Sequence, residues 1–279
     1  MIRLAVRCAP EQAEIVLAEL VALVPGGVEE DRGPGFVEYA IYGPPGELPE
    51  LPDLQAAAGD GLVEIETTEI PDDWADRWRD FHEPVVVGDG RIVVRPSWEA
   101  EAPDVAAAEI DIVVDPGQAF GTGAHATTKA CLELLLELAD HGEARGPLVD
   151  WGTGSAVLAI AAAKLGWEPV TGVDHEVAAI EAARQNAGRN GVEGAFERLN
   201  LREQVPPVAP TVVANITAPL LLELAARIAS GEIERPRTLV LSGILRTEVD
   251  RVAGAYAGAG LGEGSRRESG DWAALLLRG

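Results

Sequence analysis

The stretch Asp150 to Ala156 reads D-W-G-T-G-S-A and follows the short apolar run Pro147-Leu148-Val149. An acidic residue at a strand end, two glycines one residue apart and then a helical pattern are typical of the ligand-binding turn of an open α/β sheet. Glycine suits such a turn because the backbone turns sharply and a ligand approaches with no Cβ in the way. Residues 150–156, called the cradle below, therefore predict a cofactor site.

Strands and helices alternate on both sides of the cradle, which is typical of a doubly wound parallel sheet. Periodicity predicts strands at 111–114, 147–149, 169–173, 211–214 and 238–241, and helices at 128–139, 157–165, 176–189, 218–228 and 245–257. We expect Ser242-Gly243 to form a turn and the tail, including 272–277, to form a final pair of strands. The fold class is α/β, with a Rossmann-like domain over residues 101–279.

The first part of the chain follows a different order, strand-helix-strand-strand-helix-strand, which matches a small ferredoxin-like α+β domain over residues 1–70. The expected strands are 2–8, 28–31, 36–42 and 62–69, with helices between Pro10 and Pro25 and near 53–58. Nothing in this domain indicates catalysis. It could serve packing or dimerisation, or it could recognise a substrate.

Residues 71–100 form an aromatic linker between these domains. Trp74, Trp78 and Phe81 share one face of a predicted helix, either packed between the domains or in contact with a ligand ring. A hairpin is expected at 85–94.

Composition limits the classes of function. The 279 residues carry 22 Lys and Arg against 46 Asp and Glu, a net charge of −24. Such a surface repels phosphate backbones, which disfavours direct nucleic-acid binding. Cys8 and Cys131 are far apart, so we expect two buried thiols, with no disulfide framework and no metal site. With no signal peptide and no long apolar run, the sequence predicts a cytoplasmic protein that does not enter a membrane, and we expect a monomer.

A second unusual stretch, D-P-G-Q-A-F-G-T-G-A-H-A-T-T at Asp115 to Thr128, is too rich in glycine and threonine for an ordinary connection, and this favours contact with a ligand. Thr127 or Thr128 is expected to cap the following helix. His125 is either a general base or a structural hydrogen-bond donor.

The cradle and Asp174 together indicate which ligand is bound. Asp174 follows the glycines by about twenty residues, where an acid accepts hydrogen bonds from a ribose. Val157 occupies the sixth place of the dinucleotide pattern and is too large for it. Asp150 beside the ligand favours a cationic or amino-bearing group over a pyrophosphate. These residues favour S-adenosylmethionine.

With these motifs, the chain resembles the bacterial ribosomal-protein lysine methyltransferases, which act on large-subunit ribosomal protein eleven. The resemblance rests on the Asp115–Thr128 stretch, the cradle, G-V-D-H-E-V-A-A-I-E-A-A-R-Q-N, V-V-A-N-I-T-A and L-S-G-I-L, with the linker W-A-D-R-W-R-D-F-H and the R-P-S-W segment. It implies a class I S-adenosylmethionine-dependent enzyme that modifies lysine side chains of a free ribosomal protein, with the α-amino group as a second candidate target. The small domain would grip this protein.

The resemblance also implies roles for individual residues. Asn215 would position the amine where the methyl group is transferred, and His125 is the one candidate for a base. The cofactor pocket would be formed by Phe120, Gly121, Thr122, Gly123, Thr127, Thr128, Asp150, Gly152, Gly154, Asp174 and Asn215.

Two positions depart from the family pattern. Ala156 replaces a usual glycine, and the continuation after Asn215 lacks a glycine. Two alternatives therefore stay open: a methyltransferase for another protein lysine or a small amine, and a nucleoside-binding assembly or interaction factor without catalysis. Cofactor calorimetry and label transfer to the ribosomal protein separate them.

Overall fold

The structure is a computed structural model of the chain that describes residues 2–10, 13, 16, 29–33, 35–43, 62–69, 84–99, 105, 107–115 and 125–279. The chain divides into two compact units, Met1–Phe81 and His82–Gly279, and each is considered by itself. The expected helix near 53–58 and the aromatic stripe of the linker lie outside the described residues, and of the first expected helix only Ala13 and Val16 are described, both helical and buried.

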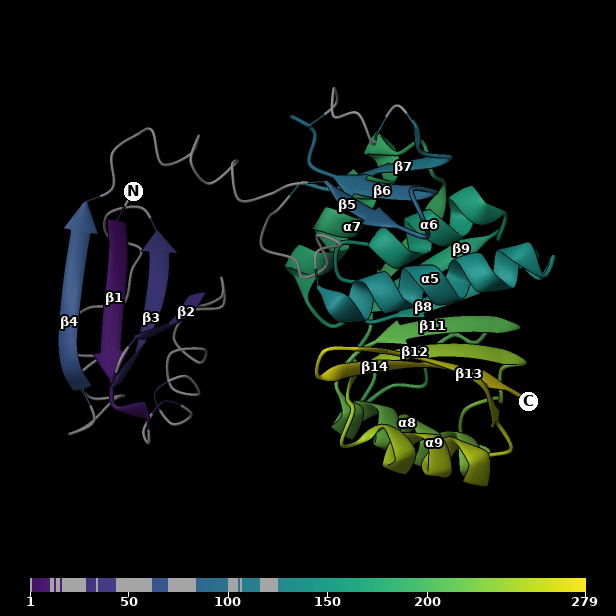
Figure 1. Cartoon of the computed structure of the whole chain (residues 1–279). Helices are drawn as coiled ribbons and strands as arrows, with labels where there is room; N and C mark the ends of the chain where they lie inside the picture. The colour runs from purple at the N-terminus through teal and green to yellow at the C-terminus, as the bar shows by residue number, and fades with distance from the viewer. Residues whose placement is uncertain are drawn as a thin grey trace. The chain divides into compact units, whose positions relative to one another are not determined.

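The first unit contains an antiparallel sheet in the order β2-β3-β1-β4 (Figure 1). Its strands are β1 (Ile2–Cys8), β2 (Glu29–Gly33), β3 (Phe36–Gly43) and β4 (Leu62–Glu69). This order, with the first and third strands in the centre, is that of the ferredoxin-like arrangement expected from the sequence. Buried side chains of the two central strands, such as Leu4, Val6 and Tyr39, form its core.

The second unit is built on a seven-stranded sheet in the order β10-β9-β8-β11-β12-β14-β13. Its strands are β8 (Leu148–Trp151), β9 (Val170–Asp174), β10 (Gly194–Arg198), β11 (Thr211–Asn215), β12 (Thr238–Leu245), β13 (Gly262–Ser269) and β14 (Trp272–Arg278). The first five strands in this order are parallel, as predicted, whereas β14 and β13 are antiparallel to their neighbours. The parallel sheet predicted for residues 148–257 and the final pair of strands predicted for the tail are both confirmed, and the last two strands run antiparallel because a hairpin needs no crossover helix.

Helices cover both faces of this sheet, with α5, α6 and α7 on one face and α8 and α9 on the other (Figure 1). They are α5 (Ala126–Asp140), α6 (Val157–Leu165), α7 (Val177–Arg189), α8 (Ala218–Ala229) and α9 (Val249–Gly258). Neighbouring strand residues alternate between the two layers, so that Val212 packs under α8 and α9 while Val213 packs under α5 to α7. Burial on both faces explains the nearly continuous apolar strands of the sequence.

A smaller sheet of β5 (Val85–Val87), β6 (Ile92–Arg95) and β7 (Ile110–Val113) belongs to the same unit. The β5–β6 hairpin is the one expected at 85–94, and β6 pairs in parallel with β7. Side chains from this sheet, including Ile92 and Ile112, join the core on the α5–α7 side. The sheet thereby holds the chain in place up to Asp115, where the glycine-rich stretch begins.

Two local predictions are wrong. Ser242-Gly243 is not a turn, because β12 continues to Leu245 through an irregularity between Leu241 and Ile244, and α9 begins only at Val249. Gly243 has a φ of 80°, and a Cβ there would clash with the backbone of Ile216. The edge strand β10 was not predicted, since Phe196 is its one buried residue.

Among the described helices, none is both long and apolar enough to cross a membrane.

Candidate active site

A cavity of 460 Å³ lies at the carboxyl edge of the parallel strands, where the chain order reverses between β8 and β11. Open α/β sheets bind ligands at this switch point, because loops from the two strands diverge and leave a crevice. The volume is within the range of about 300–1,000 Å³ that is usual for ligand sites. The predicted site residues that line it are Thr128, Gly152, Gly154, Asp174 and Asn215.

The cradle forms a tight turn between β8 and α6. Gly152 and Gly154 have φ values of 76° and 52°, in the region that favours glycine. The amides of Gly152 and Thr153 donate to the carbonyl oxygen of Val173 at 2.8 and 3.0 Å, which ties the turn to β9. Ala156, where the sequence departs from the family pattern, adopts a φ of 66° and is fully buried. The turn therefore keeps its left-handed backbone with alanine in place of glycine.

Asp174 ends β9 and faces the same turn. Its Oδ2 accepts a hydrogen bond from the amide of Gly154 at 3.0 Å, and its Oδ1 accepts one from the amide of Glu176 at 3.1 Å. A carboxylate offers about four acceptor positions. Asp174 lines the cavity, so it can bind two further donors there while it holds the cradle. This is the arrangement that the ribose prediction requires.

Asp150 lies behind the cradle instead of in the cavity wall. It is 1% exposed, and its Oδ2 accepts a hydrogen bond from the Thr153 hydroxyl at 2.8 Å. Its Oδ1 makes no hydrogen bond of normal geometry to any described residue, although the amide of Ala159 favours the charged form. Burial, and more weakly the charge of Asp174, raises the pKa of Asp150 to about 7. Asp150 therefore acts on the cavity through Thr153 and through its charge.

A second cavity, of 320 Å³, adjoins the first. Both are lined by Asn215, Ile216 and Thr217, at the end of β11 and the start of α8. The Asn215 side chain donates to the Thr128 hydroxyl at 3.3 Å, so this asparagine is fixed between the two spaces. Further lining residues of the second cavity are His125, Thr127, Gly243 and Trp272. Two molecules bound in the two cavities would meet at Asn215.

His125 is the N-cap of α5, a role that the sequence analysis assigned to Thr127 or Thr128. Its Nδ1 accepts a hydrogen bond from the amide of Thr127 at 3.3 Å and lies 2.7 Å from the Thr127 hydroxyl. Partial burial lowers the pKa of His125, which favours the neutral ring that this acceptor role needs. The ring also meets Trp272 edge-on, with centroids 5.0 Å apart. In its contact with the helix His125 accepts instead of donating, so the structural-donor prediction is wrong there, and its role as a base stays a prediction.

Several predicted residues cannot be placed in this site and several others were missed. Phe120, Gly121, Thr122 and Gly123 lie outside the described residues. Thr127 is 2% exposed and lines the second cavity instead of the first. Missed residues of the first cavity include Leu199, Asn200, Leu201 and Arg202, which follow the unpredicted strand β10. Only their position in the sequence could have indicated them, because residues that follow the carboxyl ends of β8 to β11 line this cavity.

This combination of features defines the class I methyltransferase fold: a seven-stranded sheet with an antiparallel final hairpin, a glycine cradle after β8 and an acid at the end of β9. Comparison with known proteins identifies the particular branch. Residues 51–279 match the family model described as Ribosomal protein L11 methyltransferase (PrmA). The chain belongs to this family.

Individual relatives agree with the family model. The Ribosomal protein L11 methyltransferase of Pelotomaculum thermopropionicum is 43% identical over 211 residues, which are 74% of this chain and 66% of the relative. That of Symbiobacterium thermophilum is 36% identical over 88% of this chain and 83% of its own length. The crystal structure of ribosomal protein L11 methylase from Lactobacillus delbrueckii subsp. bulgaricus has a TM-score of 0.60 at 29% identity, over 70% of this chain and 98% of the solved chain.

Proposed function

We propose that this chain transfers a methyl group from S-adenosylmethionine to lysine side chains, and to an N-terminal amine, of ribosomal protein L11. The observation that carries the proposal is the junction of two cavities at Asn215. The first cavity suits the methyl donor and the second suits the amine that receives the methyl group. Family membership favours this function over a small-amine methyltransferase and over a binding factor without catalysis.

The residues of the first cavity fit S-adenosylmethionine. The positive φ values of Gly152 and Gly154 bring the backbone close to the cavity with no side chain between. Asp174 has the acceptor capacity for the two ribose hydroxyl groups. Asp150 adds a buried carboxyl behind Thr153 whose Oδ1 has no hydrogen-bond partner among the described residues, and its ionised form favours a ligand with an ammonium group. When bound, the cofactor supplies an electrophilic methyl group on a sulfonium.

The residues of the second cavity would bind and orient the acceptor amine. A lysine must lose its proton before it attacks, and its usual pKa is about 10.4. A cavity with Ile216, Trp272 and a neutral His125 in its wall lowers the pKa of an entering amine by desolvation. The Asn215 side-chain oxygen can accept a hydrogen bond from the amine and direct its lone pair at the methyl group. Positioning of this kind supplies much of the rate enhancement in a direct transfer.

The proposal extends to the state of the substrate. With a net charge of −24, the enzyme repels ribosomal RNA and attracts a basic protein. We therefore propose that a monomeric enzyme methylates free L11 before assembly and binds no nucleic acid directly. Initial rates with free L11 should exceed those with assembled large subunits, and more so at low salt. A faster reaction on assembled subunits would contradict this part of the proposal, and light scattering tests the monomer.

The main test has two stages. Calorimetry with S-adenosylhomocysteine should show one site, and a methyl-labelled cofactor should then label free L11. Asn215→Ala should lower kcat about a hundredfold while the affinity for S-adenosylhomocysteine changes far less. Gln185→Ala, which removes an exposed amide from α7, is the control and should behave as wild type. No cofactor binding would overturn the assigned class, and binding without label on L11 would overturn the substrate.

A further inference from the structure

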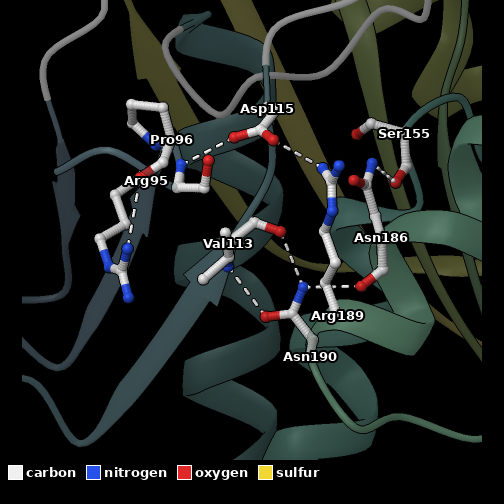
Figure 2. Close-up of polar contacts among 9 residues, drawn as sticks. Arg95, Pro96, Val113, Asp115, Ser155, Asn186, Arg189 and Asn190 are labelled. Atoms are coloured by element: carbon white, nitrogen blue, oxygen red, sulfur yellow. Dashed lines mark hydrogen bonds and ion pairs between the residues drawn. The ribbon is translucent and has the colours of Figure 1, made fainter. Parts of the chain in front are cut away.

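Asn186 of α7 and Asn190, the C-cap residue of that helix, connect the cradle to the small sheet. Asn186 and Asn190 lie one helical turn apart and point toward different parts of the structure (Figure 2). Asn186 is 5% exposed, and its Nδ2 donates to the backbone carbonyl oxygen of Ser155 at 3.0 Å. Ser155 is itself buried and lies between Gly154 and Ala156 in the cradle. The side chain of a helix thus supplies the donor for a buried carbonyl in the cofactor turn.

Asn190 continues the connection to β7. Its amide mimics a neighbouring strand, because Nδ2 donates to the Val113 carbonyl oxygen and Oδ1 accepts from the Val113 amide, both at 2.8 Å. Nδ2 also donates to the carbonyl oxygen of Asn186 at 2.8 Å. Two residues beyond Val113, Asp115 accepts hydrogen bonds from the Ser97 amide and the Arg189 guanidinium, both at 2.7 Å (Figure 2). The end of β7 is therefore held against the last turn of α7.

The cradle needs such support because of Ala156. A non-glycine residue with a φ of 66° is disfavoured by contact of its Cβ with the backbone, and this conformation persists only where the surroundings impose it. Ala156 donates to the Thr153 carbonyl oxygen at 2.8 Å, and the Asn186 bond holds the carbonyl of the residue immediately before it. Without the Asn186 donor, the buried Ser155 carbonyl would lose this hydrogen bond, which is unfavourable. The turn would then relax, and Gly154 would lose its alignment with Asp174.

We propose that Asn186 is a positioning residue for the cofactor, which holds the cradle through Ser155, and that Asn190 strengthens this effect by fixing α7 to β7. This inference rests on the proposed function, because it assumes that the cradle binds S-adenosylmethionine. Neither asparagine lines either cavity, so their effect is indirect. The effect should appear as weaker cofactor binding at a nearly unchanged rate of methyl transfer once the cofactor saturates.

The test compares S-adenosylhomocysteine binding and steady-state kinetics of wild type, Asn186→Asp, Asn186→Ala and Thr211→Val. The aspartate variant has the shape of asparagine but lacks the donor. Thr211→Val is the matched control, since it removes another buried hydrogen bond, from Trp167 Nε1 to the Thr211 hydroxyl at 3.3 Å, at the opposite end of the sheet. We expect both Asn186 variants to raise the Kd about tenfold, with a matching rise in the KM for S-adenosylmethionine and a kcat within about twofold. Thr211→Val should lower the melting temperature by about 3 °C and leave the Kd unchanged.

The outcomes separate this inference from the proposed function. If wild type does not bind S-adenosylhomocysteine, the proposed function fails. If wild type binds and the folded Asn186 variants bind equally well, or if Thr211→Val weakens binding as much as they do, the positioning role is wrong. Should the Asn186 variants fail to fold, Asn190→Asp decides instead. Aspartate cannot donate to the carbonyl oxygens of Val113 and Asn186, so we expect the Kd to rise about threefold. An unchanged Kd in that variant would equally overturn the inference.

Discussion

Replacing Asp174 by alanine removes an acid that contacts both the cradle and the first cavity. Its carboxylate accepts hydrogen bonds from the amides of Gly154 and Glu176, and because these bonds form without a ligand they contribute mainly to stability. The affinity depends on the two further acceptor positions. A hydrogen bond to a charged group contributes about 1.5–3 kcal/mol. Because two amides already share this carboxylate, we use the lower end for each ribose hydroxyl, about 3 kcal/mol in total.

This free energy corresponds to a rise of about 150-fold in the Kd for S-adenosylhomocysteine, measurable by calorimetry. Glu181→Ala is the control, because it removes an exposed acid from α7 that lines neither cavity, and its Kd should stay within about twofold of wild type.

A ligand series tests the reasoning more directly than the size of the effect. Adenosine should bind wild type more tightly than 2′,3′-dideoxyadenosine, whereas Asp174→Ala should bind the two ligands alike. This double comparison isolates the contact between the carboxylate and the hydroxyl groups. If the variant kept the full preference for adenosine, the ribose hydroxyls would be bound elsewhere and the assignment of Asp174 would be refuted.

Substitutions at three further positions, His125, Asp150 and Gly152, test other parts of the site. His125→Ala should lower the free energy of unfolding by about 1 kcal/mol, whereas His125→Asn should keep both the helix cap and most of the activity; equal inactivity of the two would indicate a general base. Because Asp150 has a folded-state pKa of about 7, above its unfolded value of about 3.9, wild type should gain stability relative to Asp150→Asn as pH falls from 8 to 5. If chemical denaturation gave the same difference in free energy of unfolding between wild type and Asp150→Asn at pH 8 and at pH 5, the raised pKa would be contradicted. Gly152→Ala should destabilise by about 1–3 kcal/mol, since its φ is 76° and an added Cβ would clash with Ile216, whereas Gly188→Ala, in open space on a helix, should not.

Elements whose ends carry local signals were predictable from sequence. Helix α6 begins at Val157 and ends at Leu165 as predicted, because the cradle precedes it and Gly166 follows it. Strand β4 likewise matches the alternating run from Leu62 to Glu69. In both cases the local backbone preference and the tertiary structure agree.

Elements that depend on distant partners were not predictable. Ser242-Gly243 has the composition of a turn, but pairing of Leu241 and Ile244 with β14, and of Ser242 with β11, keeps it within β12. His125 is a poorer cap than threonine by intrinsic preference, and its packing against Trp272, 147 positions further along the sequence, is invisible locally. Such contacts override propensity wherever the chain returns to the same place.

The sequence indicated which residues belong to the site better than it indicated what each of them does. Asp150 lies one residue before the end of β8 and Asp174 ends β9, and the sequence predicted a ligand contact for both. Their different surroundings separate them: Asp150 is directed at the Thr153 hydroxyl behind the cradle, and Asp174 is directed at the cavity. The asparagines of α7 carry no motif of their own, so only the folded structure reveals their connection to Ser155 and Val113.

The position of β14 between β12 and β13 has a consequence for how a protein substrate can be recognised. It buries the apolar strand Trp272–Arg278 and leaves the polar strand Gly262–Ser269 at the rim. There Arg266 pairs with Glu263, and Arg267 pairs with Glu137 of α5. Charged rims discourage the addition of a foreign strand. A polypeptide that reaches this enzyme therefore cannot readily extend the large sheet at its β13 edge.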